Sequence, residues 1–373
     1  MQNDDGSVLA IVGEDNQSPP SSATGQSLYG SPSTTATVAS AAAYAYGAIV
    51  FRSAGFGTYA DDLTNRAKKA WSWATASPKV LFYNNDQASG TAGLGSGQQE
   101  VDDYGRLTKK LGAAVYLYEL TGDTQYRDFF DANYAQMHLI ASNYAYPFEL
   151  EQQDNLLEYT RATGATAAVV KKIKDTYKAA IAGAEGLGAV RGNTDPYGAY
   201  LKDYVWGSNQ TKSSAGDMLY DVVVFAIDST ANGDAARGAE RYIHYLHGVN
   251  PIQLVYLSNM GAHGASKSVT RFFHTWYAHG SALWDTVGVS TYGPPPGYLV
   301  GGPNPSYSWD GCCPGGCSGV SCGAAVLSPP SGQPPQKSYL DFNDSWPIDS
   351  WSVTEPSDGY QAVYIRLLSK FVK

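Results

Sequence analysis

The chain has 373 residues, few charged side chains and a formal net charge of −9, so its composition lacks the basic surface that nucleic-acid binding requires. No apolar run approaches the roughly 20 residues of a membrane-spanning helix, and the first residues lack the pattern of a signal peptide. The 28 tyrosines and eight tryptophans favour either a helical core packed with tyrosine or an aromatic cleft for carbohydrate.

Helical patterns dominate the chain after a polar N-terminal segment. Thr34–Phe51 is apolar nearly all round and predicts a buried helix, and Asp61–Ala74 predicts an amphipathic one. Gln98–Leu120 predicts a third long helix, which Gly122 ends. This succession, with hardly a strand, predicts an all-α fold. Further helices are expected at about 124–142, 165–186, 214–228 and 233–247.

The character of the sequence changes at Asn250. Glycine and proline become frequent and periodicity fades until Trp351, so long loops are expected there, and such loops are usually functional. Apolar residues from Tyr360 to Phe371 then recur at helical spacing. Pro356 fits the first turn of this last helix.

Glu355 lies just before that helix, in a segment rich in Trp, Tyr and Asp. Inverting hydrolysis of a glycoside needs a protonated acid and a carboxylate base, and Glu355 could be the acid. A helix N-terminus would lower the pKa of its carboxyl group, so burial against Trp346, Trp351 and Tyr360 would have to raise that pKa. The alternative, favoured by position alone, is that Glu355 only caps the helix.

All four cysteines lie in a Gly/Pro/Ser-rich loop at 305–335. Local disulfides are the simplest arrangement, and a zinc site or free thiols are the alternatives. Disulfides would indicate an oxidising, extracytoplasmic compartment. The disulfide candidates are Cys312, Cys313, Cys317 and Cys322.

A cluster of Arg271, His274 and His279 among aromatic residues has two interpretations of equal weight. It is either a loop that clamps sugar hydroxyl groups or a helix with histidines on its polar side. The sequence contains no H-E-x-x-H, Walker-type or G-x-S-x-G motif, so metalloprotease, nucleotide-binding and serine-hydrolase interpretations lack support.

Several short motifs follow one another in a specific order. Trp206–Asn209 reads W-G-S-N, Val300–Pro303 reads V-G-G-P, and Tyr360 follows Glu355 by five residues. Together with Asn250-Pro251 and Leu117–Asp123, these motifs resemble glycoside hydrolase family 9, the cellulase family with an (α/α)6 barrel. The resemblance covers nearly the whole chain.

The resemblance implies that residues 1–373 form one (α/α)6 barrel of paired helices and hydrolyse β-1,4-glucosidic bonds with inversion. Glu355 would be the general acid, and Trp206, His274 and Tyr360 would line the cleft. No cofactor or catalytic metal is expected, while a structural calcium ion stays open. The partner would be a β-glucan, and the protein would be an extracellular monomer. The alternatives are a non-hydrolytic β-glucan-binding protein and a glycosidase of this fold that acts on xyloglucan or another β-linked glycan.

The sequence also departs from the family pattern. Thr354 replaces the Asn that precedes the acid, and the Arg of the family's H-H-R segment has no clear equivalent. Met1–Val8 resembles a stretch that lies downstream of the family's D-A-G-D base motif, so we expect the general base and the first barrel helices to be missing and hydrolysis to be weak. Four aspartates, none of which stands where the family keeps its base, are Asp102, Asp103, Asp341 and Asp344.

Overall fold

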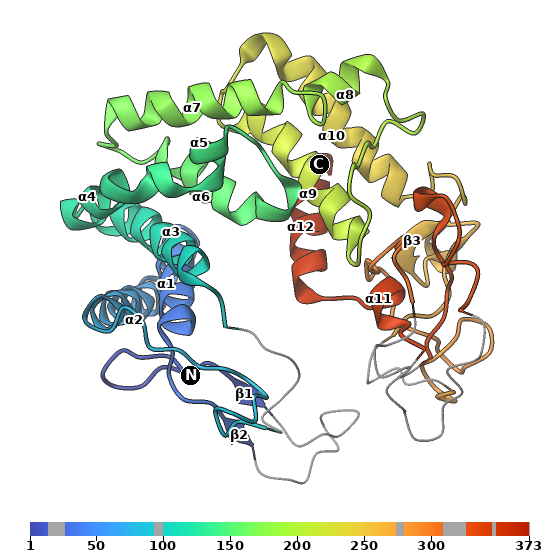
Figure 1. The fold of residues 1–373 in the computed structure, drawn as a ribbon, viewed down its shortest axis with the longest axis horizontal. Helices are drawn as coiled ribbons and strands as arrows, with labels where there is room; N and C mark the ends of the chain where they lie inside the picture. The colour runs from blue at the N-terminus through green and yellow to red at the C-terminus, as the bar shows by residue number, and fades with distance from the viewer. Residues whose placement is uncertain (14–26, 93–99, 274–279, 309–325, 345–347, 373) are drawn as a thin grey trace. The chain divides into compact units, whose positions relative to one another are not determined.

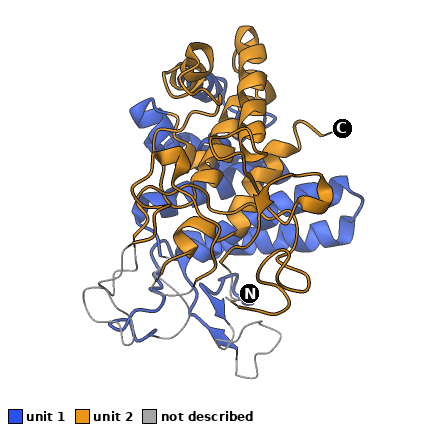
Figure 2. Ribbon diagram, turned by 90° about the vertical axis from the view of Figure 1, so that its right-hand side faces the viewer, with its two compact units in different colours: residues 1–144, 151–177 blue, residues 145–150, 178–373 orange. Residues whose placement is uncertain are grey.

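The computed structural model describes residues 1–13, 27–92, 100–273, 280–308, 326–344 and 348–372 (Figure 1). They fall into two compact units: residues 1–144 with 151–177, and residues 145–150 with 178–373 (Figure 2). Helices form most of the regular structure, which confirms the all-α expectation. The described strands form two small sheets: β1 (Val12–Gly13) pairs antiparallel with β2 (Leu28–Tyr29), and β3 (Val255–Ser258) pairs parallel with β4 (Ser268–Val269).

Unit 1 is built on α1 (Thr34–Ser53), which packs against α2 (Gly57–Ala76) and α3 (Asp103–Thr121). Half of the buried residues of α1 are alanines, whose small size allows close helix packing. Ser33 caps the helix by accepting a hydrogen bond from the Ala36 N–H. The expectation that no apolar run approaches the length of a membrane span does not hold for α1, which has 20 residues. By length and hydropathy α1 would qualify as a membrane span, a test that a core helix of a soluble protein passes equally.

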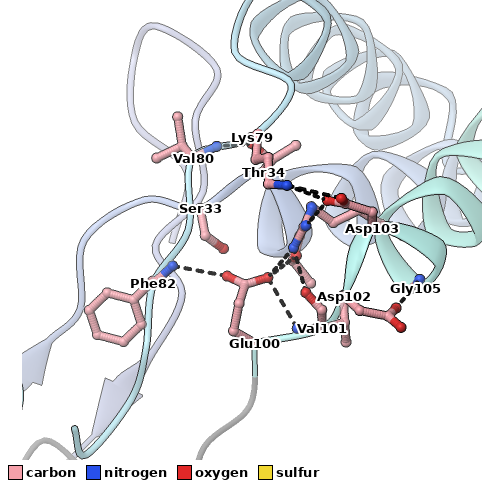
Figure 3. Close-up of polar contacts among 12 residues, drawn as sticks. Ser33, Thr34, Lys79, Val80, Phe82, Glu100, Val101, Asp102, Asp103 and Gly105 are labelled. Atoms are coloured by element: carbon pink, nitrogen blue, oxygen red, sulfur yellow. Dashed lines mark hydrogen bonds and ion pairs between the residues drawn. The ribbon is translucent and has the colours of Figure 1, made fainter. Parts of the chain in front are cut away.

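Helix α3 begins five residues later than Gln98–Leu120 predicts. Asp102 caps it by accepting a hydrogen bond from the Gly105 N–H at 2.8 Å. Just before this cap, Glu100 accepts hydrogen bonds from the Phe82 N–H at 2.9 Å and the Val101 N–H at 3.1 Å, and forms an ion pair with Arg106 (Figure 3). These contacts hold residue 100 outside the helix.

The remainder of this half of the chain differs from the prediction in detail. The helix expected at 124–142 is interrupted, because Met137 is extended between α4 (Thr124–Asn133) and α5 (His138–Ser142). Two helices were not predicted: α6 (Leu150–Tyr159) and α8 (Leu187–Gly192). Helix α7 (Ala167–Ile181) is shorter than the expected range of 165–186.

Unit 2 is built on α9 (Ser208–Val224), which packs against α10 (Asn232–Leu246) and α12 (Asp358–Leu368). Helix α9 begins six residues before the expected position. Its first two turns bury polar side chains, so no hydrophobic period marks them in the sequence. The buried polar residues there are Ser208, Asn209, Thr211, Lys212, Ser213 and Ser214.

The long loops expected after Asn250 are confirmed over the described part of that region, where short strands and 3₁₀ turns are the only regular elements before α11 (Trp351–Thr354). The expected start of the last helix is wrong. Pro356 lies outside α12, which Ser357 caps by accepting a hydrogen bond from the Tyr360 N–H at 3.2 Å. Proline disfavours helical geometry in the residue before it, and Glu355 is accordingly extended, with ψ of 129°.

Candidate active site

Glu355 lies at the C-terminal end of the short helix α11, three residues before α12 begins. It therefore does not cap α12, and the acidic residue in the first turn of that helix is Asp358. The capping alternative is contradicted. The expected lowering of its pKa by the N-terminus of the last helix also has no structural basis.

The pKa of the Glu355 carboxyl group is raised from 4.5 to about 7. Burial is the larger cause, because it removes water from the charged form, and the negative charge of Asp349 is the second. The expected direction, a rise caused by burial, is confirmed. A carboxyl group with this pKa is protonated in a large fraction of molecules near neutral pH, as a proton donor must be.

A ladder of main-chain hydrogen bonds fixes the backbone around Glu355. The Gly301 N–H donates to the Glu355 carbonyl at 3.1 Å, and the Gly302 N–H donates to the Val353 carbonyl at 2.8 Å. On its other side, the Gly301 carbonyl accepts from the Asn209 N–H at 2.9 Å, and the Asn209 side-chain amide donates to the Val300 carbonyl at 3.0 Å. The W-G-S-N motif, the V-G-G-P motif and Glu355 therefore form one connected structure.

The two glycines of this ladder are required by space. A Cβ atom on Gly301 would lie 2.9 Å from the Val353 carbonyl oxygen. A Cβ atom on Gly302 would lie 2.4 Å from the Asn209 side chain, and Gly302 also has φ of +99°, which disfavours other residues. The glycine pair thus allows the loop to approach both α9 and the segment 353–355.

Tyr360 and Trp206 meet beside Glu355. The Trp206 side chain lies near the Tyr360 hydroxyl, and a Cβ atom on Gly207 would lie 2.8 Å from that hydroxyl oxygen. Burial, together with the nearby Glu355 charge, raises the pKa of Tyr360 to about 12, so its hydroxyl stays protonated. Trp206 is 47% exposed. The structure brings these three sequence-predicted residues together and leaves an aromatic ring open to a ligand.

Thr354, which stands where the family pattern has Asn, is fully buried. Its hydroxyl accepts from the Phe273 N–H at 3.1 Å and lies 2.8 Å from the Phe342 carbonyl, to which it can donate. Thr354 thus joins three segments of the loop region behind Glu355.

The nearby aspartates have different environments. Asp341 accepts hydrogen bonds from the Thr270 N–H, the Thr270 hydroxyl and the Tyr339 hydroxyl, which gives it a structural role. Asp349 acts on Glu355 through its charge, and sequence reasoning missed it. Only its place six residues before Glu355 could have drawn attention to it.

Several sequence predictions fall outside the described residues. These are the cleft residue His274, with His279 and Trp346, and all four disulfide candidates in the 305–335 loop. Arg271, the third member of that polar cluster, donates to the Asp341 carbonyl at 3.1 Å. Within the described ranges, no group of three or more His, Cys, Asp or Glu residues is arranged to hold a metal ion.

Comparison with known proteins gives consistent matches. The model of Glycosyl hydrolase family 9 matches residues 1–368. A cellulose 1,4-beta-cellobiosidase of Acetivibrio thermocellus is 26% identical in an alignment of 325 positions that covers 79% of this chain and 32% of that protein.

Solved structures match the fold. That of the GH family 9 endoglucanase J30 matches with a TM-score of 0.73 and 22% identity, covering 100% of this chain and 61% of that one. The structure of endoglucanase CelQ from Clostridium thermocellum, complexed with cellotriose, matches with a TM-score of 0.59 and 19% identity, covering 99% and 54%. The chain thus spans less than two thirds of the length of these relatives.

Proposed function

Because the chain belongs to glycosyl hydrolase family 9, we propose that it takes part in hydrolysis of β-1,4-glucosidic bonds in cellulose or a related β-glucan. Its relatives include a cellobiosidase and endoglucanases, so the choice between terminal and internal bonds stays open. The proposed ligand is a glucan chain, whose sugar faces stack well on exposed aromatic rings such as Trp206.

The observation that carries the proposal is the environment of Glu355. Its pKa of about 7 suits a general acid. The charge of Glu355 acts on the Tyr360 hydroxyl, and the Trp206 indole lies near that hydroxyl. These two side chains supply hydrogen-bonding and stacking groups for a sugar.

We propose that Glu355 protonates the oxygen of the leaving sugar as the glycosidic C–O bond breaks. In an inverting reaction, water attacks the anomeric carbon from the opposite face and loses its proton to a base roughly 6.5–9.5 Å from the acid. We assign no residue of this chain as that base.

The test is cleavage of a soluble, neutral cellulose derivative, followed by the fall in its viscosity with and without added azide, because cleavage by azide creates no new reducing end. Azide is a nucleophile that needs no general base, so it reports the acid even if water is poorly activated. The Glu355→Gln variant should lose on the order of 10²–10⁴-fold in rate in both arms, because the leaving oxygen is no longer protonated. Glycosyl azide is the expected product with azide.

The matched control is Asp358→Asn, an exposed carboxylate three residues along the chain, which should keep the wild-type rate. Equal rates for wild type and Glu355→Gln would contradict the role of Glu355. Binding of cellotriose without bond cleavage in either arm would indicate the non-hydrolytic alternative instead.

We further propose an extracellular location and a monomeric state. Family membership and the cysteine cluster support the location, since disulfides persist in oxidising compartments. Thiol titration of the unfolded chain without reductant tests the extracellular location. Two disulfides leave no reactive thiol, whereas four reactive thiols would contradict that location.

A further inference from the structure

Thr354 lies at a junction of three chain segments, directly before Glu355. Its side chain is fully buried. The hydroxyl oxygen accepts a hydrogen bond from the Phe273 N–H at 3.1 Å. It lies 2.8 Å from the Phe342 carbonyl and 3.0 Å from the Ser350 carbonyl, to either of which it can donate. One side-chain oxygen thus connects the segment that contains Phe273, the segment that contains Phe342 and the short helix that ends before Glu355.

The segments that contain Phe273 and Phe342 are also bound to each other. The Asp341 carboxylate accepts hydrogen bonds from the Thr270 N–H at 2.8 Å and from the Thr270 hydroxyl at 2.9 Å. These two segments therefore support each other, and the Thr354 hydroxyl fastens to both of them the backbone that leads to the proposed acid.

These side-chain bonds complement the main-chain bonds around Glu355. The glycine ladder holds the carbonyl groups of Val353 and Glu355. The Glu355 N–H donates to the Trp351 carbonyl at 3.3 Å, which is longer than the usual range for such a bond. The bonds of the Thr354 hydroxyl are shorter, so they contribute a firm attachment one residue before the acid.

A hydroxyl group suits this position because its single oxygen can accept one hydrogen bond and donate another. Valine has nearly the same shape but neither function. In its place, the Phe273 N–H would lose this acceptor and the Phe342 carbonyl this donor. A buried polar group that loses its partner is costly, so the segments would shift to recover partners or to admit water. Either change would alter the surroundings of the adjacent carboxyl group.

Such a change can be separated from a change in charge. The titratable groups that interact with the Glu355 carboxyl group are Asp349 and Tyr360. Replacement of Thr354 by valine or serine removes no charge and leaves both groups in the chain. A lower pKa of Glu355 in such a variant would therefore report weaker burial or a new position of the carboxyl group.

We propose that Thr354 is a positioning residue, whose hydroxyl holds the Glu355 carboxyl group in place by fastening the preceding backbone to the segments that contain Phe273 and Phe342. The inference rests on the proposed function, in which Glu355 is the general acid. It gives a specific task to the threonine that stands where the family pattern has asparagine.

The test compares Thr354→Val, which removes the hydroxyl, with Thr354→Ser, which keeps it. Initial rates on the neutral cellulose derivative are measured across pH. Thr354→Val should lower kcat about tenfold with a smaller effect on KM, because a misplaced acid slows the chemical step more than it weakens binding. Its alkaline limb should move to lower pH, since a less buried carboxyl group has a lower pKa. Thr354→Ser should restore both properties.

Thr37 in unit 1 provides the matched control. It is also fully buried, and its hydroxyl accepts from the Val8 N–H at 3.0 Å and lies 2.7 Å from the Ser33 carbonyl. Thr37→Val therefore removes an equivalent pair of hydrogen bonds at residues that do not contact Thr354. It should lower the stability in a similar way, measured by urea unfolding, but leave the alkaline limb unchanged. If Thr354→Val does not fold, the smaller Thr354→Ala takes its place.

Three results would overturn the inference. The first is an unchanged alkaline limb in a folded variant that lacks the Thr354 hydroxyl. The second is a loss in Thr354→Ser as large as that in Thr354→Val, which would show that the methyl group matters and the hydroxyl does not. The third is the same shift of the limb in Thr37→Val.

Failure of the proposed function gives a different result. A wild-type rate in Glu355→Gln contradicts the role of Glu355, whatever the Thr354 variants do. If the chain does not hydrolyse the substrate, carboxyl ¹³C NMR measures the pKa of Glu355 directly, with Glu355→Gln to assign the signal. Thr354→Val should lower this pKa and Thr37→Val should not. Equal pKa values in wild type and Thr354→Val would overturn the inference without any measurement of activity.

Discussion

The pKa of the Glu355 carboxyl group is raised by two different causes. Burial raises its pKa by removing water, and Asp349 raises it further by repulsion. A fixed apolar environment is difficult to alter by one substitution, whereas the charge of Asp349 is removable. The second cause can therefore be tested separately from the first.

Replacing Asp349 by Asn should lower the pKa of Glu355, while leaving it above 4.5 because the effect of burial remains. Hydrolysis that needs protonated Glu355 should then decline at a lower pH than in wild type. The pH dependence of the rate on a neutral cellulose derivative measures this, with Asp358→Asn as control. An unchanged alkaline limb in Asp349→Asn would contradict the electrostatic role.

Lys212 gives a second residue-scale prediction, on stability. Burial lowers the pKa of its amine from 10.5 to about 7, while the unfolded chain keeps the higher value. Between these values the unfolded state binds more protons, so wild-type stability should rise with pH relative to Lys212→Met, by up to about 1.4 kcal/mol per pH unit. Urea unfolding of both proteins across this window measures the difference. A difference independent of pH would show that Lys212 does not titrate between the two pKa values.

At the scale of elements, the sequence predicted the positions of long apolar helices well and their ends poorly. Thr34–Phe51 nearly coincides with α1, because alanine and valine mark its whole length. The start of α9 was missed because its first turns bury serine, threonine and asparagine, which carry no hydrophobic signal. The (α/α)6 expectation came from motif resemblance, and the matches to family 9 structures confirm it.

For the candidate site, the sequence predicted the residues but not the backbone conformation or the electrostatics around Glu355. Trp206, Glu355 and Tyr360 belong to motifs with a distinctive residue pattern, so the sequence alone predicts them as site residues. The extended backbone at Glu355 depends on Pro356, whereas the sequence pattern places Pro356 in the first turn of the last helix. Asp349 raises the pKa of Glu355 because the two carboxyl groups are close in space, and their separation in the sequence does not predict this closeness.

The glycine ladder yields an element-scale prediction. Gly302 and Gly297 both have positive φ, of +99° and +91°, but only Gly302 has a neighbour where a Cβ atom would lie. Gly302→Ala should therefore be on the order of 2 kcal/mol more destabilising than Gly297→Ala, because it adds overpacking against Asn209 to the backbone strain. Chemical denaturation measures both, and equal losses would show that the contact with Asn209 relaxes freely.

At the scale of the whole molecule, the net charge of −9 bears on substrate choice. A negative protein repels a polyanion at long range, and salt screens that repulsion. Cleavage of carboxymethyl cellulose at neutral pH should accordingly increase as salt rises towards about 0.15 M, whereas cleavage of uncharged hydroxyethyl cellulose should change little. The ratio of the two initial rates across a salt series measures this. Parallel salt responses would indicate that the overall charge does not influence access.

The position of Glu355 is set by amide-to-carbonyl bonds that reach from α9 through Gly301 and Gly302 to residues 353 and 355. Such bonds involve backbone atoms that every residue except proline possesses, so apart from the glycines they place few demands on side chains. Mutations can thus accumulate over evolutionary time around this frame without displacing the carboxylate.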